Sequence, residues 1–158
     1  MLRLSLAAAL LLTGVTASHG QAPAARKVPS DADIIKMCGA RLATVFARFG
    51  TPDDVTVSRG SNTDLDKVSL DYGSYAIQVR GKTVRTCLFF SSYASPIKGV
   101  KIGDTRAQVE KVLGTEHKIE KSSIDVDDYG YALKDLDAMF WTDFDKEGKV
   151  RMVEIQRN

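Results

Sequence analysis

The side chains that could do chemistry in this chain are two cysteines, two histidines and several clustered carboxylates. His19 lies in an N-terminal leader described below, so His117 is the histidine that remains once the leader is removed. No spacing of residues in the sequence points to a catalytic triad that contains this histidine. A structural zinc site needs about four ligands, and two separated cysteines with one histidine supply too few. The sequence also lacks a glycine-rich phosphate loop. We therefore expect neither an enzyme nor a cofactor, and we expect His117 to be exposed.

One acidic segment matches part of a calcium-binding loop. Asp143, Asp145, Glu147 and Gly148, with Glu154 in the last position, fit the ligand and glycine positions of that template. The template requires flanking helices, whereas the residues on both sides here alternate as β-strands do. A β-hairpin with an Asp/Gly turn explains the same residues, and we favour it over a calcium sensor or a metal-dependent enzyme. A second acidic group is interpreted as a solvated turn: Asp125, Asp127 and Asp128.

Residues 1–20 predict a secretory signal peptide. Arg3 begins a short positive region, residues 4–15 are apolar, and residues 18–20 offer small residues at the cleavage positions before Gln21. The apolar run is shorter than the roughly 20 residues of a transmembrane helix, and no cysteine near the cleavage point could accept a lipid. We expect a periplasmic or secreted protein without a membrane anchor after cleavage. Residues 21–29, rich in Ala and Pro, are predicted to form a disordered lead-in.

The charge balance of the mature chain is close to neutral. Removing 20 of the 158 residues leaves 138, and the loss of Arg3 leaves 21 basic against 20 acidic residues, a net charge of +1. This balance argues against a nucleic-acid partner. A chain of this length can bury an ordinary hydrophobic core.

The hydrophobic pattern predicts two helical segments, each followed by strands. Residues 31–49 carry apolar side chains with a 3.6-residue period, and Gly50 can end that helical pattern. Thr105 can cap a second, short helix, because Gln108 can reach back to the N–H of Thr105, and Gly114 can end it. After each of the two helix-ending glycines the period changes to two, which is typical of half-buried strands.

The order of these elements indicates a tandem repeat. The helix-ending glycines are 114 − 50 = 64 residues apart, and the hairpin glycines Gly81 and Gly148 are 148 − 81 = 67 residues apart. We interpret the chain as two units, residues 30–93 and residues 94–158. The predicted fold class is α+β, a tandem repeat of short helices packed on one face of a four-stranded antiparallel sheet.

The segment Ile102-Gly-Asp-Thr-Arg-Ala-Gln-Val109, followed by Leu113-Gly114, resembles the helix signature of the β-lactamase inhibitory protein superfold. That superfold includes the SmpA/OmlA/BamE-type outer-membrane assembly lipoproteins. The resemblance implies a helical hairpin on a four-stranded sheet, present twice in the inhibitor. This chain departs from the family at Asp104, where most relatives have Met or Leu, and in its cysteine positions. It also lacks the acylated cysteine of the lipoproteins.

Nearly all of the aromatic residues between Tyr72 and Phe144 lie on predicted strands. Phe89 next to Phe90, and Phe140 next to Trp141, must point to opposite faces of a sheet. One ring of each pair then faces away from the helices and can anchor a protein partner, or it can belong to a dimer interface or to a core between the units. The residues predicted to bind a protein are Tyr75, Tyr129, Tyr131 and Trp141.

From the doubling, the resemblance and these aromatic residues we predict a non-enzymatic protein-binding module. An inhibitor of an extracytoplasmic enzyme is one form of it, and the alternative is an envelope or outer-membrane assembly or structural factor of the SmpA/BamE type. The identity of the partner protein and the oligomeric state are left open.

The two cysteines are predicted to form a disulfide. Cys38 shares the apolar stripe of the first helical segment with Ile34 and Leu42, and Cys87 lies in the middle of a strand of the first unit. If that helix packs on that sheet, the two side chains meet in the core, and export to an oxidising compartment favours their pairing. The alternative is two buried free thiols.

Overall fold

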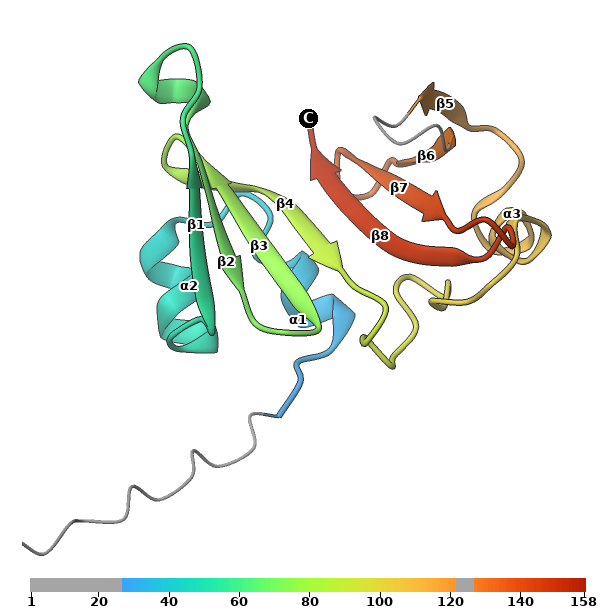
Figure 1. Cartoon of the computed structure of the whole chain (residues 1–158), viewed down its shortest axis with the longest axis horizontal. Coiled ribbons are helices and arrows are strands. Elements are labelled where there is room, and N and C mark those ends of the chain that lie inside the picture. The colour runs from blue at the N-terminus through green and yellow to red at the C-terminus, as the bar shows by residue number, and fades with distance from the viewer. Residues whose placement is uncertain (1–26, 122–126) are drawn as a thin grey trace, which may run out of the picture.

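The computed structural model describes residues 27–121 and 127–158, which form one antiparallel sheet with short helices beside it (Figure 1). The predicted signal peptide, residues 21–26 of the lead-in, and Asp125 lie outside the described residues. The strands are β1 (Asp54–Ser58), β2 (Lys67–Asp71), β3 (Tyr75–Arg80), β4 (Thr83–Phe89), β5 (Lys118–Lys121), β6 (Asp127–Leu133), β7 (Ala138–Phe144) and β8 (Val150–Arg157). Their order across the sheet is β1-β2-β3-β4-β8-β7-β6-β5.

The helices of the described residues are short: α1 (Asp31–Ile35), α2 (Leu42–Phe49), the 3-10 turn η1 (Thr63–Leu65) and α3 (Arg106–Leu113). The predicted cap of α3 is confirmed, since the N–H of Thr105 donates to Oε1 of Gln108 over 2.8 Å and Gly114 ends the helix with a φ of 93°. Within the described residues, no helix is long and apolar enough to cross a bilayer.

The predicted fold class is wrong. We expected an α+β tandem repeat of short helices packed on one face of a four-stranded antiparallel sheet, whereas the structure is mostly β, with eight strands in one sheet and only a few short helices. The apolar period over residues 31–49 does not produce a continuous helix, because the chain turns after α1 and Gly39 takes a φ of +88°. The division into units 30–93 and 94–158 stays a prediction, since one hydrophobic cluster contains residues of both.

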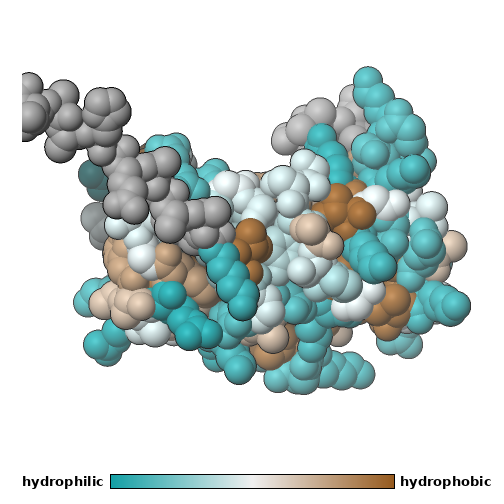
Figure 2. All heavy atoms as spheres, turned by 90° about the horizontal axis from the view of Figure 1, so that it is seen from below, coloured by the Kyte–Doolittle hydropathy of each residue, from teal (hydrophilic) through white to brown (hydrophobic). Residues whose placement is uncertain are grey.

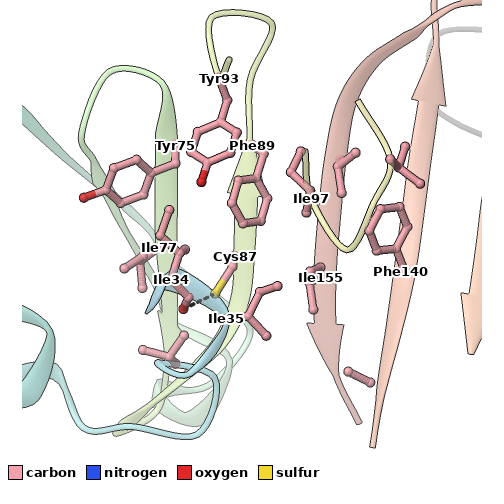
Figure 3. Packing of buried hydrophobic residues seen from close by; sticks show 14 of the residues in the cluster. Ile34, Ile35, Tyr75, Ile77, Cys87, Phe89, Tyr93, Ile97, Phe140 and Ile155 are labelled. Atoms are coloured by element: carbon pink, nitrogen blue, oxygen red, sulfur yellow. Dashed lines mark hydrogen bonds between the residues drawn. The ribbon is translucent and has the colours of Figure 1, made fainter. Parts of the chain in front are cut away.

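The hydrophobic core runs across the seam where β4 pairs with β8 (Figure 3). Cys87 and Phe89 of β4 lie opposite Ile155 and Val153 of β8, and all four side chains are fully buried. Phe140 of β7 continues this row beyond β8. Because buried apolar area is the main favourable term in folding, this shared core holds the two halves of the sheet together.

The helices contact one face of this sheet. The Cys87 thiol donates a hydrogen bond to the carbonyl oxygen of Ile34 in α1 (3.5 Å). The guanidinium of Arg106 in α3 lies over the ring of Tyr129, 4.3 Å from the ring centroid. In Figure 1, α1 and α2 lie by β1–β4 and α3 lies by β5–β8. Since side chains alternate along a strand, the residues next to these, such as Leu88 and Trp141, point to the opposite face.

Candidate binding surface

We call the face of the sheet that points away from α1, α2 and α3 the open face. Its central row runs across four strands, with Leu88 opposite Glu154, Glu154 opposite Trp141, and Trp141 opposite Gly130. A second row joins Gln78, Thr86, Gln156 and Met139 in the same way. On the side of the molecule seen in Figure 2, hydrophobic side chains occur in small separate groups among hydrophilic ones.

Trp141 lies against the backbone of Gly130 on the open face. The two residues are direct partners on β7 and β6, and a Cβ added at Gly130 would come within 2.6 Å of Cζ3 of the indole. The missing side chain of Gly130 thus makes the space that the ring fills. The indole is half-buried, and its Nε1 is buried without a hydrogen-bond partner among the described residues.

The other three predicted binding residues lie on the helix face. Tyr75 is 1% exposed and stacks on Tyr72 with ring centroids 5.0 Å apart, and Tyr131 is 2% exposed. Tyr129 is half-buried beneath Arg106, whose guanidinium also donates to the Tyr129 hydroxyl over 3.1 Å. The structure therefore separates these residues from Trp141, and it leaves Tyr75 and Tyr131 almost no surface for a partner. Their role in protein binding stays a prediction.

His117, which we expected to be exposed, is half-buried on the helix face. Its ring lies 5.2 Å from that of Tyr129 and 5.8 Å from that of Tyr131, and its Nε2 is 3.2 Å from a guanidinium nitrogen of Arg106. Arg106 also pairs with Glu110 over 2.7 Å. This group packs α3 onto the sheet.

Three carboxylates surround Trp141 on the open face. Asp128, Asp143 and Glu154 line a hollow of about 20 Å³ together with the indole and Met152. Asp143 pairs with Arg151 over 2.7 Å through one oxygen, but its Oδ1 and the Oδ1 of Asp128 are buried without a hydrogen-bond partner among the described residues. Burial raises the pKa of Asp128, and the charge of Asp143 adds to that rise. Although Asp128 was interpreted as part of a solvated turn, it lies in β6 and is half-buried.

The residues of the calcium-loop template are divided between two places in the structure. Asp145 lies in the turn between β7 and β8, where its Oδ1 accepts hydrogen bonds from the backbone N–H groups of Glu147 (3.0 Å) and Lys149 (2.8 Å). Glu154 points instead into the hollow beside Trp141. Within the described residues, no group of three or more histidine, cysteine or acidic side chains is placed to hold a metal ion.

The Glu154 carboxylate gives a testable dependence of stability on pH. Burial raises its pKa above the ordinary value of 4.5, and the positive charge of Lys67 opposes that rise only in part. The pKa of Glu154 is therefore higher in the folded chain than in the unfolded chain, and the folded chain keeps the proton to a higher pH. As a result, the free energy of unfolding falls as the pH rises from about 4.5 toward neutrality. We expect Glu154→Gln to raise the free energy of unfolding at pH 7 by about 1 kcal/mol, since it removes a partly buried unpaired charge.

The measurement is urea unfolding of both proteins at several pH values between 4 and 8. The difference in the free energy of unfolding between Glu154→Gln and the parent should be largest at neutral pH and should decrease as the pH is lowered. Glu116→Gln removes the same charge from an exposed loop and serves as the control. A difference that is constant across this range would show that Glu154 has the same pKa in the folded and unfolded chain.

A basic hollow of about 300 Å³ lies on the open face at the other end of the β4–β8 seam. Its lining includes Gln78, Thr86 and Gln156, and four basic residues surround these: Lys67, Arg80, Arg85 and Arg157. These four basic residues are scattered in the sequence and lie up to 90 positions apart, as 157 − 67 shows. The pairing of β2 with β3, and of β4 with β8, brings them together. A periodic pattern could place each residue on a strand but not choose the neighbouring strand.

The two cysteines lie in contact on the helix face. Their Sγ atoms are 3.2 Å apart and are not bonded in the structure, so the predicted disulfide stays a prediction. The hydrogen bond between the two thiols lowers the pKa of the Cys38 thiol, and the positive charge of Arg157 acts in the same direction. The same hydrogen bond, together with burial, raises the pKa of Cys87. Cys38 is therefore the thiol that ionises first.

Comparison with known proteins places the chain by fold alone. No protein-family profile matches it, and no curated protein is significantly similar to it in sequence. The DUF4309 family protein YjgB from Bacillus subtilis has a similar structure, with a TM-score of 0.58 and 15% identity over 84% of this chain and 88% of that one. An extracellular protein containing an SCP domain from Bacillus anthracis matches with a TM-score of 0.54 and 13% identity, over 85% of this chain and 49% of its own.

A cysteine-rich secretory protein from Staphylococcus aureus matches with a TM-score of 0.52 and 12% identity, over 78% of this chain and 44% of its own. This chain thus spans about half the length, or less, of the two secreted proteins. At such low identity the likeness concerns the fold. The resemblance to the β-lactamase inhibitory protein superfold stays an expectation, because these three structures do not bear on it.

Proposed function

We propose that this chain is a non-enzymatic protein-binding module, secreted or periplasmic, that holds its partner on the open face beside Trp141. The observation that carries the proposal is the hollow around this side chain, where an indole, a methionine and three carboxylates lie together on a face that α1, α2 and α3 leave uncovered. Tryptophan is among the side chains that most often dominate binding energy at protein interfaces.

The charges of this surface define the partner that fits it. Glu154 and Asp128 are only half-buried, and burial raises the pKa of both carboxyls. A lysine or arginine brought to the rim of the hollow would donate to these carboxylates and stabilise their charged form. Trp141, Met139 and Met152 offer apolar contact next to them. The expected partner surface therefore presents a basic side chain beside an apolar one.

The proposed location outside the cytoplasm has two supports. The N-terminal residues fit a secretory signal peptide, and two of the three similar structures are described as an extracellular and a secretory protein. A protein partner of this chain is then an extracytoplasmic protein.

Site-specific photocrosslinking tests this proposal. A photoreactive side chain at Met139 of the open face should capture a discrete protein from an envelope extract, and one at Lys111, exposed on α3, should not. The captured protein is then purified, and its affinity for the unmodified chain is measured. We expect Asp128→Asn with Glu154→Gln to weaken that affinity at least tenfold, because two charge-assisted contacts are lost, whereas Glu116→Gln should leave it unchanged.

The experiment also separates the two forms of the proposal. Loss of catalytic activity of a captured hydrolase on titration with this chain would identify an inhibitor. Capture of an outer-membrane assembly protein would instead assign the alternative, an assembly or structural factor. Equal capture from Met139 and Lys111, or an affinity that the two carboxylate substitutions leave unchanged, would contradict binding through the open face.

A further inference from the structure

The basic hollow brings like charges together. Lys67 of β2 and Arg80 of β3 are direct cross-strand partners, and Arg85 of β4 lines the same hollow. Like charges directly opposite each other on antiparallel strands are destabilising. Among the described residues that line the hollow there is no aspartate or glutamate. Folding therefore assembles a repulsive group at this point of the open face.

The surrounding contacts leave most of this positive charge available. Within the described residues, neither Lys67, Arg80, Arg85 nor Arg157 forms an ion pair with a side-chain carboxylate. Arg85 donates to the backbone oxygen of Asn158 over 3.1 Å, and Arg157 donates to that of Cys38 over 3.1 Å. The positive charge of Lys67 lowers the pKa of Glu154, but the Glu154 carboxylate lines the hollow beside Trp141 and not the basic hollow.

We propose that this basic hollow is a binding site for a multivalent phosphoryl group, held by Lys67, Arg80 and Arg85. Guanidinium groups bind phosphate oxygens through two parallel N–H donors, and lysine adds a point charge. The amides of Gln78 and Gln156 line the same hollow and can donate further hydrogen bonds. The volume of about 300 Å³ is at the lower end of the range of small-molecule pockets.

The number of charges favours a multivalent anion over a single carboxylate. One carboxylate neutralises one of the three basic side chains Lys67, Arg80 and Arg85 and leaves the charges of the other two uncompensated. A pyrophosphate or a phosphate ester supplies two or more negative charges and several acceptor oxygens within one small group. Binding would therefore relieve the repulsion between Lys67 and Arg80 as well as form new hydrogen bonds. This site does not depend on the proposed protein partner, whose surface lies around Trp141.

Isothermal titration of the purified mature protein with inorganic pyrophosphate tests this site. We expect saturable binding that weakens about tenfold in Arg80→Gln and further in Arg80→Gln with Arg85→Gln, since each substitution removes a charge-assisted contact. Arg59→Gln removes the same charge outside the hollow and should bind as the parent does. Without ligand, Arg80→Gln should melt no lower than the parent, because it removes a repulsion, so a loss of binding will not reflect unfolding.

Two further titrations define the ligand. Sulfate and citrate at matched ionic strength should bind more weakly, and equal affinities for them would overturn the phosphoryl assignment. Co-sedimentation with vesicles of phosphatidylcholine and phosphatidic acid distinguishes the two sources of a phosphoryl group, a lipid headgroup and a soluble phosphate. Sedimentation that depends on Arg80 and Arg85 indicates a lipid headgroup, and pyrophosphate binding without sedimentation indicates a soluble phosphate. Absence of saturable pyrophosphate binding, or binding that the double substitution leaves unchanged, would overturn the site.

Discussion

Reducing the mature protein is expected to lower its free energy of unfolding by about 4 kcal/mol, the loop-entropy value for a crosslink between Cys38 and Cys87. The expectation assumes that export oxidises this pair. The two Sγ atoms already lie 3.2 Å apart, so a small side-chain movement brings them to the roughly 2.05 Å of a disulfide bond. Cys38 ionises first, so its thiolate attacks the disulfide of an extracytoplasmic oxidant and releases one thiol of it. The Cys87 thiolate then attacks the Sγ of Cys38 in this mixed disulfide, which forms the bond and releases the second thiol of the reduced oxidant.

Urea unfolding with and without reductant measures this difference, with Cys38→Ala as the control that should not respond to reductant. The crosslink would join the turn after α1 to β4, so reduction should increase amide hydrogen exchange in β3 and β4 more than in β6 and β7. Thiol labelling of the denatured, unreduced protein decides the assignment. Two reactive thiols in each chain would show that the pair stays reduced, and the predicted difference would then be absent.

The local elements of this chain could be predicted because local physics decides them. The cap of α3 at Thr105 and the positive φ of Gly114 depend on residues a few positions apart, and the structure confirms them. Predictions of this kind need no knowledge of the complete sheet.

The binding surface depends on the complete sheet and could not be predicted in the same way. The period of two places Tyr129 and Tyr131 on one face of their strand and Phe140 and Trp141 on opposite faces of theirs, but it does not say which face the helices cover. The basic hollow requires the pairing of β2 with β3 and of β4 with β8, which joins Lys67, Arg80 and Arg85 from separate strands. Helix content was overestimated because the turn after α1 interrupts an apolar period that still looks helical in the sequence.

The contact between Trp141 and Gly130 leads to the second large expected effect. Gly130→Val should lower the free energy of unfolding by about 1–3 kcal/mol, the usual cost of overpacking. Gly130 is an interior residue of β6, where valine is an acceptable strand former, so the cost comes from the clash with the indole ring. Trp141 is the single tryptophan of the chain, and its fluorescence reports the displacement directly. A red shift of the emission maximum should accompany the loss of stability as the ring moves toward solvent.

Two matched variants separate the clash from a general effect of valine in this strand. Ala132→Val places the same side chain two residues along β6, at an exposed position of the same face, and should change neither stability nor emission appreciably. Trp141→Ala combined with Gly130→Val should cost less than the sum of the two single substitutions, because the removed ring leaves room for the valine. Additive costs would show that Gly130 and Trp141 act independently. If the open face binds its partner as proposed, Gly130→Val should also weaken that binding, because it moves the aromatic anchor while all three carboxylates remain in the chain.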